Sequence, residues 1–106
     1  MKTSRTGQRV CHEEVMHVAK AAAGEHYEVL MKDNEFYKVW QRQNPNKNGK
    51  QLQQAFIDRN WGKYLEFARA TLVEMLKRPD VEEMMKGKIM DVLEKDWSVR
   101  NKRFVN

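Results

Sequence analysis

The apolar positions between Asn60 and Trp97 repeat at the spacing of two consecutive helices. We expect Asn60 to cap the first helix, and Pro79 cannot continue it. Asp80 and Glu83 have the spacing of a capping box that starts the second helix. Steps of three and four residues place apolar side chains on one helical face. The first stripe comprises Trp61, Leu65, Ala68, Leu72 and Met75, and the second comprises Val81, Met85, Ile89 and Val92.

This C-terminal helical hairpin has the most regular pattern in the chain, and we expect it to be the centre of stability. Upstream, residues 10 to 23 predict a helix that runs on or kinks at Gly24, because glycine weakens a helix interior. Asp33 is placed to cap a separate helix that ends near Gln43. Asn44 to Gly49 predicts a loop, because Pro45 disfavours helix before it and Asn48-Gly49 tolerates a positive φ. A short helix then ends near Asp58.

About five helical segments result, so the sequence predicts an all-α fold, either a compact helical bundle or an irregular array. A chain of 106 residues, 41% apolar and 33% charged with 5 Gly and 2 Pro, fits a single helical domain spanning 1–106. No apolar run approaches the roughly 20 residues of a membrane span, and no signal peptide precedes the first helix. With the lone Cys11, these features predict a cytoplasmic protein.

The net charge of +5 is concentrated at the two ends. Residues 1–9 and 98–106 each carry three basic residues and no acid, and we expect these basic ends to be flexible in the isolated chain. Because they hold 6 of the 20 basic residues, the body has 14 basic and 15 acidic residues, a net charge of −1. Such ends attract phosphate or acidic surfaces without discriminating among them.

The one cluster that resembles a metal or catalytic site lies near the N-terminus, at Cys11, His12, Glu13, Glu14 and His17. Zinc proteases hold their metal with histidines four residues apart on one helical face, whereas His12 and His17 are five apart. We therefore expect no metal and no cofactor. No glycine-rich phosphate loop or nucleophile elbow is present, and the sequence predicts a non-enzymatic protein.

Methionine is abundant in the second half of the chain, where Met84 and Met85 are adjacent and cannot share one narrow apolar stripe. Either they fill the core or they form an exposed, adaptable binding surface. Trp40, Trp61 and Trp97 are expected first as core anchors and second as interface residues. The chain is thus predicted to bind a protein partner or to form a homo-oligomer. The candidate partner-binding residues are Met84, Met85, Trp97, Arg100, Lys102 and Arg103.

Nucleic-acid binding is the alternative hypothesis, with phosphate contacts from the basic ends and from residues 42–50. Trp40 or Phe104 would then stack on an exposed base. A helix-turn-helix interpretation, with recognition from Trp61 onward, is weakened by the mixed charges of Lys63 and Glu66. The candidate residues for nucleic acid are Lys2, Arg5, Arg9, Arg42, Lys47 and Lys50.

The run Asn60-Trp61-Gly-Lys-Tyr-Leu-Glu-Phe-Ala-Arg-Ala-Thr-Leu, followed by Met75-Leu76-Lys-Arg-Pro79-Asp80, resembles the small helical proteins of tailed bacteriophages. The resemblance implies a virion component or a small protein that binds and redirects a host factor. It implies no particular site residue. Together with the residue pattern, it predicts a small helical interaction protein with a macromolecular partner.

Overall fold

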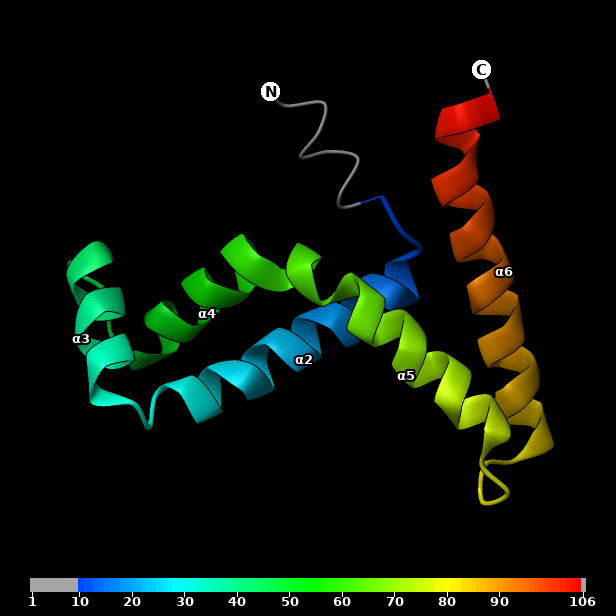
Figure 1. Ribbon diagram of the computed structural model, residues 1–106, viewed down its shortest axis with the longest axis horizontal. Coiled ribbons are helices and arrows are strands. Elements are labelled where there is room, and N and C mark those ends of the chain that lie inside the picture. The colour runs from blue at the N-terminus through cyan, green and yellow to red at the C-terminus, as the bar shows by residue number, and fades with distance from the viewer. Residues whose placement is uncertain (1–9, 106) are drawn as a thin grey trace.

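The computed structural model (Figure 1) describes the backbone of residues 10–105 and the side chains of residues 10–101. Every regular element in that part of the chain is helical, which confirms the predicted all-α fold. Lys2, Arg5 and Arg9 lie outside the described residues, as do the side chains of Lys102 and Arg103. The elements are α2 (Glu13–Leu30), α3 (Asn34–Gln43), α4 (Gly49–Asn60), the 3-10 helix η1 (Trp61–Tyr64), α5 (Leu65–Lys77) and α6 (Glu83–Val105).

Helix α2 runs without interruption through Gly24. Its start is capped by His12, whose Nδ1 accepts a hydrogen bond from the Glu14 amide at 3.0 Å. At Gly24 the neighbouring helix α4 approaches closely, since a Cβ there would lie 3.3 Å from Ile57 Cδ1. Gln53 of α4 also donates to the Gly24 carbonyl at 3.1 Å. The glycine therefore serves helix packing and does not break the helix.

Side chains cap the starts of both α3 and α4. Asp33 caps α3 as predicted, accepting from the amides of Glu35 and Phe36. Asn48 caps α4 in a reciprocal capping box with Gln51. This role requires extended backbone, and Asn48 has a φ of −89°. The left-handed conformation that Asn48-Gly49 could tolerate is adopted in this loop by Asn46, which has a φ of 72°.

Both predicted caps of the C-terminal hairpin were wrong. Asn60 keeps a helical backbone, and its side-chain amide donates back to the Phe56 carbonyl at 2.9 Å. Helix α4 therefore extends to Asn60 and passes through η1 into α5 without a side-chain cap. Asp80 instead accepts two hydrogen bonds from the Arg78 guanidinium, at 3.0 and 2.8 Å. Helix α6 consequently begins at Glu83, three residues after the expected start.

The core is centred on α2, which contacts α4, η1, α5 and α6. Its buried residues recur every fourth position, namely Val15, Ala19, Ala23 and Tyr27. In α6, Ile89 and Asp96 are the buried side chains among residues 83–101. The C-terminal hairpin also contributes to this core, mainly through the apolar stripe of α5 and through Ile89 of α6. That the hairpin is the centre of stability stays a prediction.

Two of the three tryptophans anchor the core as predicted. Trp40 and Trp61 are buried, and the Trp40 ring is surrounded by Phe36, Phe56 and the Arg59 guanidinium. Trp97 is 61% exposed, so its predicted place in the core was wrong. It follows the buried Asp96 on α6, but its own side chain is exposed.

The helices form a flat, open array, because α5 and α6 meet at the hairpin turn and α6 then diverges from the other helices (Figure 1). The array measures 44 × 40 × 17 Å, with a radius of gyration of 16.4 Å. A compact domain of this length has a radius of gyration of about 13 Å. The fold is thus an irregular array, and its open side exposes apolar surface on α6.

Candidate functional site

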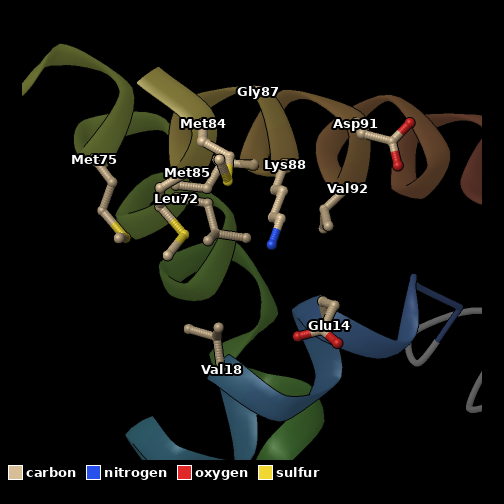
Figure 2. Close-up of a pocket in the computed structure, with 11 residues that line it drawn as sticks. Glu14, Val18, Leu72, Met75, Met84, Met85, Gly87, Lys88, Asp91 and Val92 are labelled. Atoms are coloured by element: carbon tan, nitrogen blue, oxygen red, sulfur yellow. The ribbon is translucent and has the colours of Figure 1, made fainter. Parts of the chain in front are cut away.

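A groove lies where α6 diverges from α5 and from the start of α2 (Figure 2). Its volume is about 790 Å³. Figure 2 shows side chains of α6 and α5 on one side of the groove and side chains of α2 on the opposite wall. The surface is mainly apolar, with charges at its edge. It is lined by Glu14, Val18, Leu72, Met75, Met84, Met85, Gly87, Lys88, Ile89, Asp91 and Val92.

Helical geometry explains why α6 presents two methionines to this groove. Ile89 and Asp96, seven residues apart, share the face that α6 buries. Met84, Lys88 and Asp91 follow one another at steps of four and three on the adjoining flank. Met84 is 73% exposed and Met85 is 48% exposed. The core-filling role considered for them is therefore wrong, and both belong to an open apolar surface.

The charges of the groove are of both signs. Lys88 extends from α6 toward α2, and Glu14 stands on the opposite wall (Figure 2). Within the described part of the chain, no carboxylate oxygen lies within the 4.0 Å ion-pair distance of Lys88 Nζ. Asp91 forms an ion pair with Lys95 at 3.0 Å, one turn further along α6. The groove thus offers an ammonium group that has no ion-pair partner in the described chain.

Asp96 fixes the position of α6 beside the groove. Its carboxylate is fully buried and accepts from Arg69 Nε at 2.9 Å and from the His12 amide at 2.8 Å. Arg69 also reaches the Val10 carbonyl at 3.3 Å, so this cluster joins α5, α6 and the start of α2. Arg100 Nε approaches Asp96 to 3.3 Å as an ion pair without hydrogen-bond alignment.

Sequence reasoning missed this cluster, although a signal for it was present. Asp96 lies seven residues after Ile89, so it occupies a core position of the α6 stripe. A carboxylate at such a position needs a buried cationic partner, because an isolated buried charge is costly. Arg69, one position after the buried Ala68 of the α5 stripe, is that partner. Arg100, which was predicted to bind a partner, therefore also has a structural contact within the chain.

Trp97, a further candidate whose side chain the structure describes, lies on another flank of α6. Trp97 and Met90 are seven residues apart and share a face, and Met90 is 54% exposed. That face is about 120° around the helix axis from Met84. The structure therefore brings Met84 and Met85 together in the groove and separates Trp97 from them.

The N-terminal cluster of possible ligands is dispersed by the start of α2. His12 is occupied as the cap, and Glu13 and His17 form the expected surface pair at 3.9 Å. Burial raises the pKa of the Cys11 thiol, and the negative charge of Asp96 raises it further, which disfavours the nucleophilic thiolate. Among the residues that the structure describes, no group of three potential metal ligands comes together.

Three of the basic residues proposed for nucleic acid lie in the described part of the chain, at the corner between α3 and α4. Arg42 is in the last turn of α3, Lys47 lies in the loop and Lys50 is in the first turn of α4, and all three are exposed. Trp40 was expected to stack on a base, which is wrong because it is buried and its indole nitrogen donates to the Leu52 carbonyl at 3.0 Å. The side chain of Phe104, the other stacking candidate, lies outside the described residues.

Comparison with protein-family models, curated proteins and solved structures gave no significant match. The described helices include none that combines the length and the apolar character needed to cross a membrane. The candidate site therefore has to be interpreted from its own geometry.

Proposed function

We propose that this chain is a small helical interaction protein that binds a protein partner in the groove between α2, α5 and α6. The observation that carries the proposal is the exposure of Met84 and Met85 on a single concave apolar surface. Contiguous apolar surface on a small protein is typical of binding sites. Thioether side chains adapt to partners of different shape, as in other methionine-rich binding surfaces.

The shape of the groove suits an amphipathic helix. Grooves between helices bind partner helices through apolar residues that repeat at steps of three and four. Leu72, Met75 and Val92 provide an apolar surface, while Lys88 and Asp91 can pair with charges beside the apolar stripe of such a helix. The proposal is one of binding without catalysis, and the raised pKa of Cys11 argues against this thiol as a nucleophile. The bacteriophage resemblance is compatible with a virion component or a protein that binds a host factor.

Site-specific photocrosslinking tests the proposal. A benzoylphenylalanine in place of Met84 reports on the groove, and one in place of Val29, which is 61% exposed on α2 outside the groove, is the matched control. We expect a defined protein adduct from position 84, identified by mass spectrometry, and none from position 29. Equal adducts from both positions, or none from position 84, would contradict the proposal.

A blocking variant sharpens this test. Gly87 lies in the groove, and a Cβ there would meet nothing within 4 Å. Gly87→Arg should therefore preserve the fold while it fills the groove, and the adduct from position 84 should disappear. An unchanged adduct would show that the partner binds elsewhere.

Nucleic-acid binding is a second candidate function, favoured by one observation. Arg42, Lys47 and Lys50 are exposed around a single loop, and none has a carboxylate within ion-pair distance in the described part of the chain. Fluorescence anisotropy with a labelled DNA duplex at low and physiological salt tests this candidate. Binding that weakens steeply with salt, is lost when these three residues become alanine and tolerates Met84→Glu would establish it. Binding that is indifferent to the three substitutions would exclude the corner as the site.

A further inference from the structure

We infer that the partner in the groove is α6 of a second copy of this chain, packed antiparallel across a two-fold axis level with the middle of the Lys88 to Asp91 segment. This inference rests on the proposed function, because it names the occupant of the proposed binding groove. It follows from the order of charges on α6 and from the open space at Gly87.

The charge order selects a second copy in antiparallel orientation. In a two-fold interface, residue i of one copy contacts residue j of the other, and j contacts i. With the axis between Lys88 and Asp91, each Lys88 lies level with Asp91 of the second copy, so two complementary pairs form. Each Lys88 thereby gains the carboxylate that the described part of its own chain does not place within 4.0 Å. A parallel arrangement in register would instead bring Lys88 against Lys88.

The same register gives the apolar residues of the groove a partner. In an antiparallel pair, the residue one step before Lys88 faces the residue one step after Asp91 of the second copy. Val92 of the second copy therefore lies level with Gly87. Gly87 has no side chain and an open surface, which leaves room for that valine beside Met84 and Met85. Met84 of the second copy lies level with Lys95 and next to Val92. The aliphatic stem of Lys95 is suited to cover a methionine.

The opposite wall supplies a further complementary charge. Glu14 stands across the groove from α6 and is exposed (Figure 2). A lysine that enters the groove from a second copy would therefore lie between the Glu14 and Asp91 carboxylates. The flat, open shape of the single chain leaves this side of α6 uncovered, and a second copy would cover it.

The decisive experiment uses charge reversal and mixing. Sedimentation equilibrium of the wild-type chain should show a dimer that dissociates on dilution. Lys88→Glu turns each pair into two facing carboxylates, and Asp91→Lys turns each pair into two facing ammonium groups. Each variant alone should therefore dimerise at least about tenfold more weakly than the wild type.

The double variant Lys88→Glu/Asp91→Lys exchanges the two charges within one chain. In the antiparallel register each carboxylate at position 88 again lies level with an ammonium group at position 91, so this variant should regain the dimerisation of the wild type. A mixture of the two single variants can form a dimer with one copy of each. In that dimer the carboxylate introduced at position 88 of one copy faces the ammonium group introduced at position 91 of the other, and the second pair keeps the wild-type lysine and aspartate. Native mass spectrometry of that mixture should therefore find a dimer that contains one copy of each variant.

Controls separate this interface from general effects of charge and folding. Lys32→Glu makes the same charge change at an exposed position outside the groove and should dimerise as the wild type does. Circular dichroism and chemical denaturation should show that Lys88→Glu and Asp91→Lys remain folded, because both side chains are exposed.

Four results would overturn the inference: a wild-type chain that is monomeric at all concentrations, single variants that dimerise normally, a mixture that stays monomeric, or a Lys32→Glu variant that is equally impaired. A monomeric chain that still crosslinks another protein from position 84 would overturn the second copy as occupant but not the binding groove. A dimer that is indifferent to the charge variants and to Gly87→Arg, without an adduct at position 84, would overturn both.

Discussion

Asp96 is the residue on which the position of α6 most depends. Its buried carboxylate is the shared acceptor for the Arg69 side chain and the His12 amide, and so it links three segments that are distant in the sequence. Buried ion pairs add little net stability compared with apolar packing, but removal of one partner leaves an unpaired buried charge. Asp96 is therefore a structural residue that indirectly shapes the groove.

We predict that Asp96→Asn lowers the free energy of unfolding by about 3 kcal/mol. This value is at the lower end of the range for a broken buried pair, because Arg69 keeps its bond to Glu66 at 3.1 Å. Asp91→Asn removes an exposed ion pair and should cost less than about 1 kcal/mol. Urea denaturation of the two variants measures both values, and equal losses would show that the cluster does not hold α6.

Two helical glycines should respond to a different extent when alanine replaces them. Gly87→Ala should stabilise the monomeric chain by about 0.5 to 1 kcal/mol, because alanine favours the helix and its Cβ meets open space. Gly24→Ala should gain less, because its Cβ would lie 3.3 Å from Ile57 Cδ1. Thermal and urea denaturation at low protein concentration compare the two. A larger gain at position 24 would contradict the close packing of α2 against α4.

Tyr27 and Tyr64 should make the fold sensitive to alkaline pH. Burial raises the pKa of both phenols, and for Tyr27 the neighbouring Tyr37 and Glu28 raise it further. Because the folded chain holds these protons more tightly, their contribution is complete below the ordinary tyrosine pKa of about 10 and is lost as the pH rises through the folded values. Denaturation at a series of alkaline pH values should therefore show falling stability.

The Tyr27→Phe variant isolates one of these phenols. The Tyr27 hydroxyl is buried without a hydrogen-bond partner among the described residues. At neutral pH we predict that its removal leaves the free energy of unfolding unchanged or raises it by up to about 1 kcal/mol, and that the alkaline loss becomes smaller. A loss of more than about 1 kcal/mol at neutral pH would show that the hydroxyl has a partner.

At the scale of elements, α2 organises the fold through small residues. Ala19 and Ala23 are completely buried, and short side chains allow α4, η1 and α5 to approach α2 closely. We predict that Ala19→Leu costs at least about 1 to 3 kcal/mol through overpacking, whereas Ala21→Leu, at an exposed position, changes stability little. Chemical denaturation measures both, and a tolerated Ala19→Leu would show that α2 is loosely packed.

Apolar periodicity was sufficient to predict the helices, but not their contacts. The apolar spacing identified the buried stripe of α5, and the residue type of Asp33 identified the cap of α3. Both depend only on residues that are close in the sequence. The same reasoning misplaced the roles of Asn60 and Asp80, whose side chains have competing local partners in Phe56 and Arg78. Asparagine and aspartate form several kinds of local hydrogen bond, and spacing alone does not choose among them.

The groove was only partly predictable for a similar reason. Adjacent Met84 and Met85 indicated excess apolar surface, and both line the groove. The contribution of Glu14 and Val18 depends on how α6 diverges from α2, which is a long-range property that periodicity does not contain. The Asp96 cluster, which sets that arrangement, joins residues up to 84 positions apart.

The shape and charge of the whole molecule support the proposed association with a partner. The array is 17 Å thick, and the long α6 buries few side chains against its own chain. Such an arrangement leaves apolar surface that a protein partner can cover. The body of the chain is nearly neutral, and the groove carries charges of both signs. We therefore predict that binding depends mainly on apolar contacts and on specific charge pairs.

Methionine-methyl NMR can show directly whether this groove is the binding surface. Spectra of methyl-labelled chain should be recorded over a dilution series and with any protein identified by crosslinking at position 84. The signals of Met75, Met84 and Met85, which line the groove, should shift on association, whereas those of Met16 and Met31, which pack against the core outside the groove, should stay in place. Shifts confined to Met16 and Met31, or association that leaves Met84 and Met85 unchanged, would contradict this expectation.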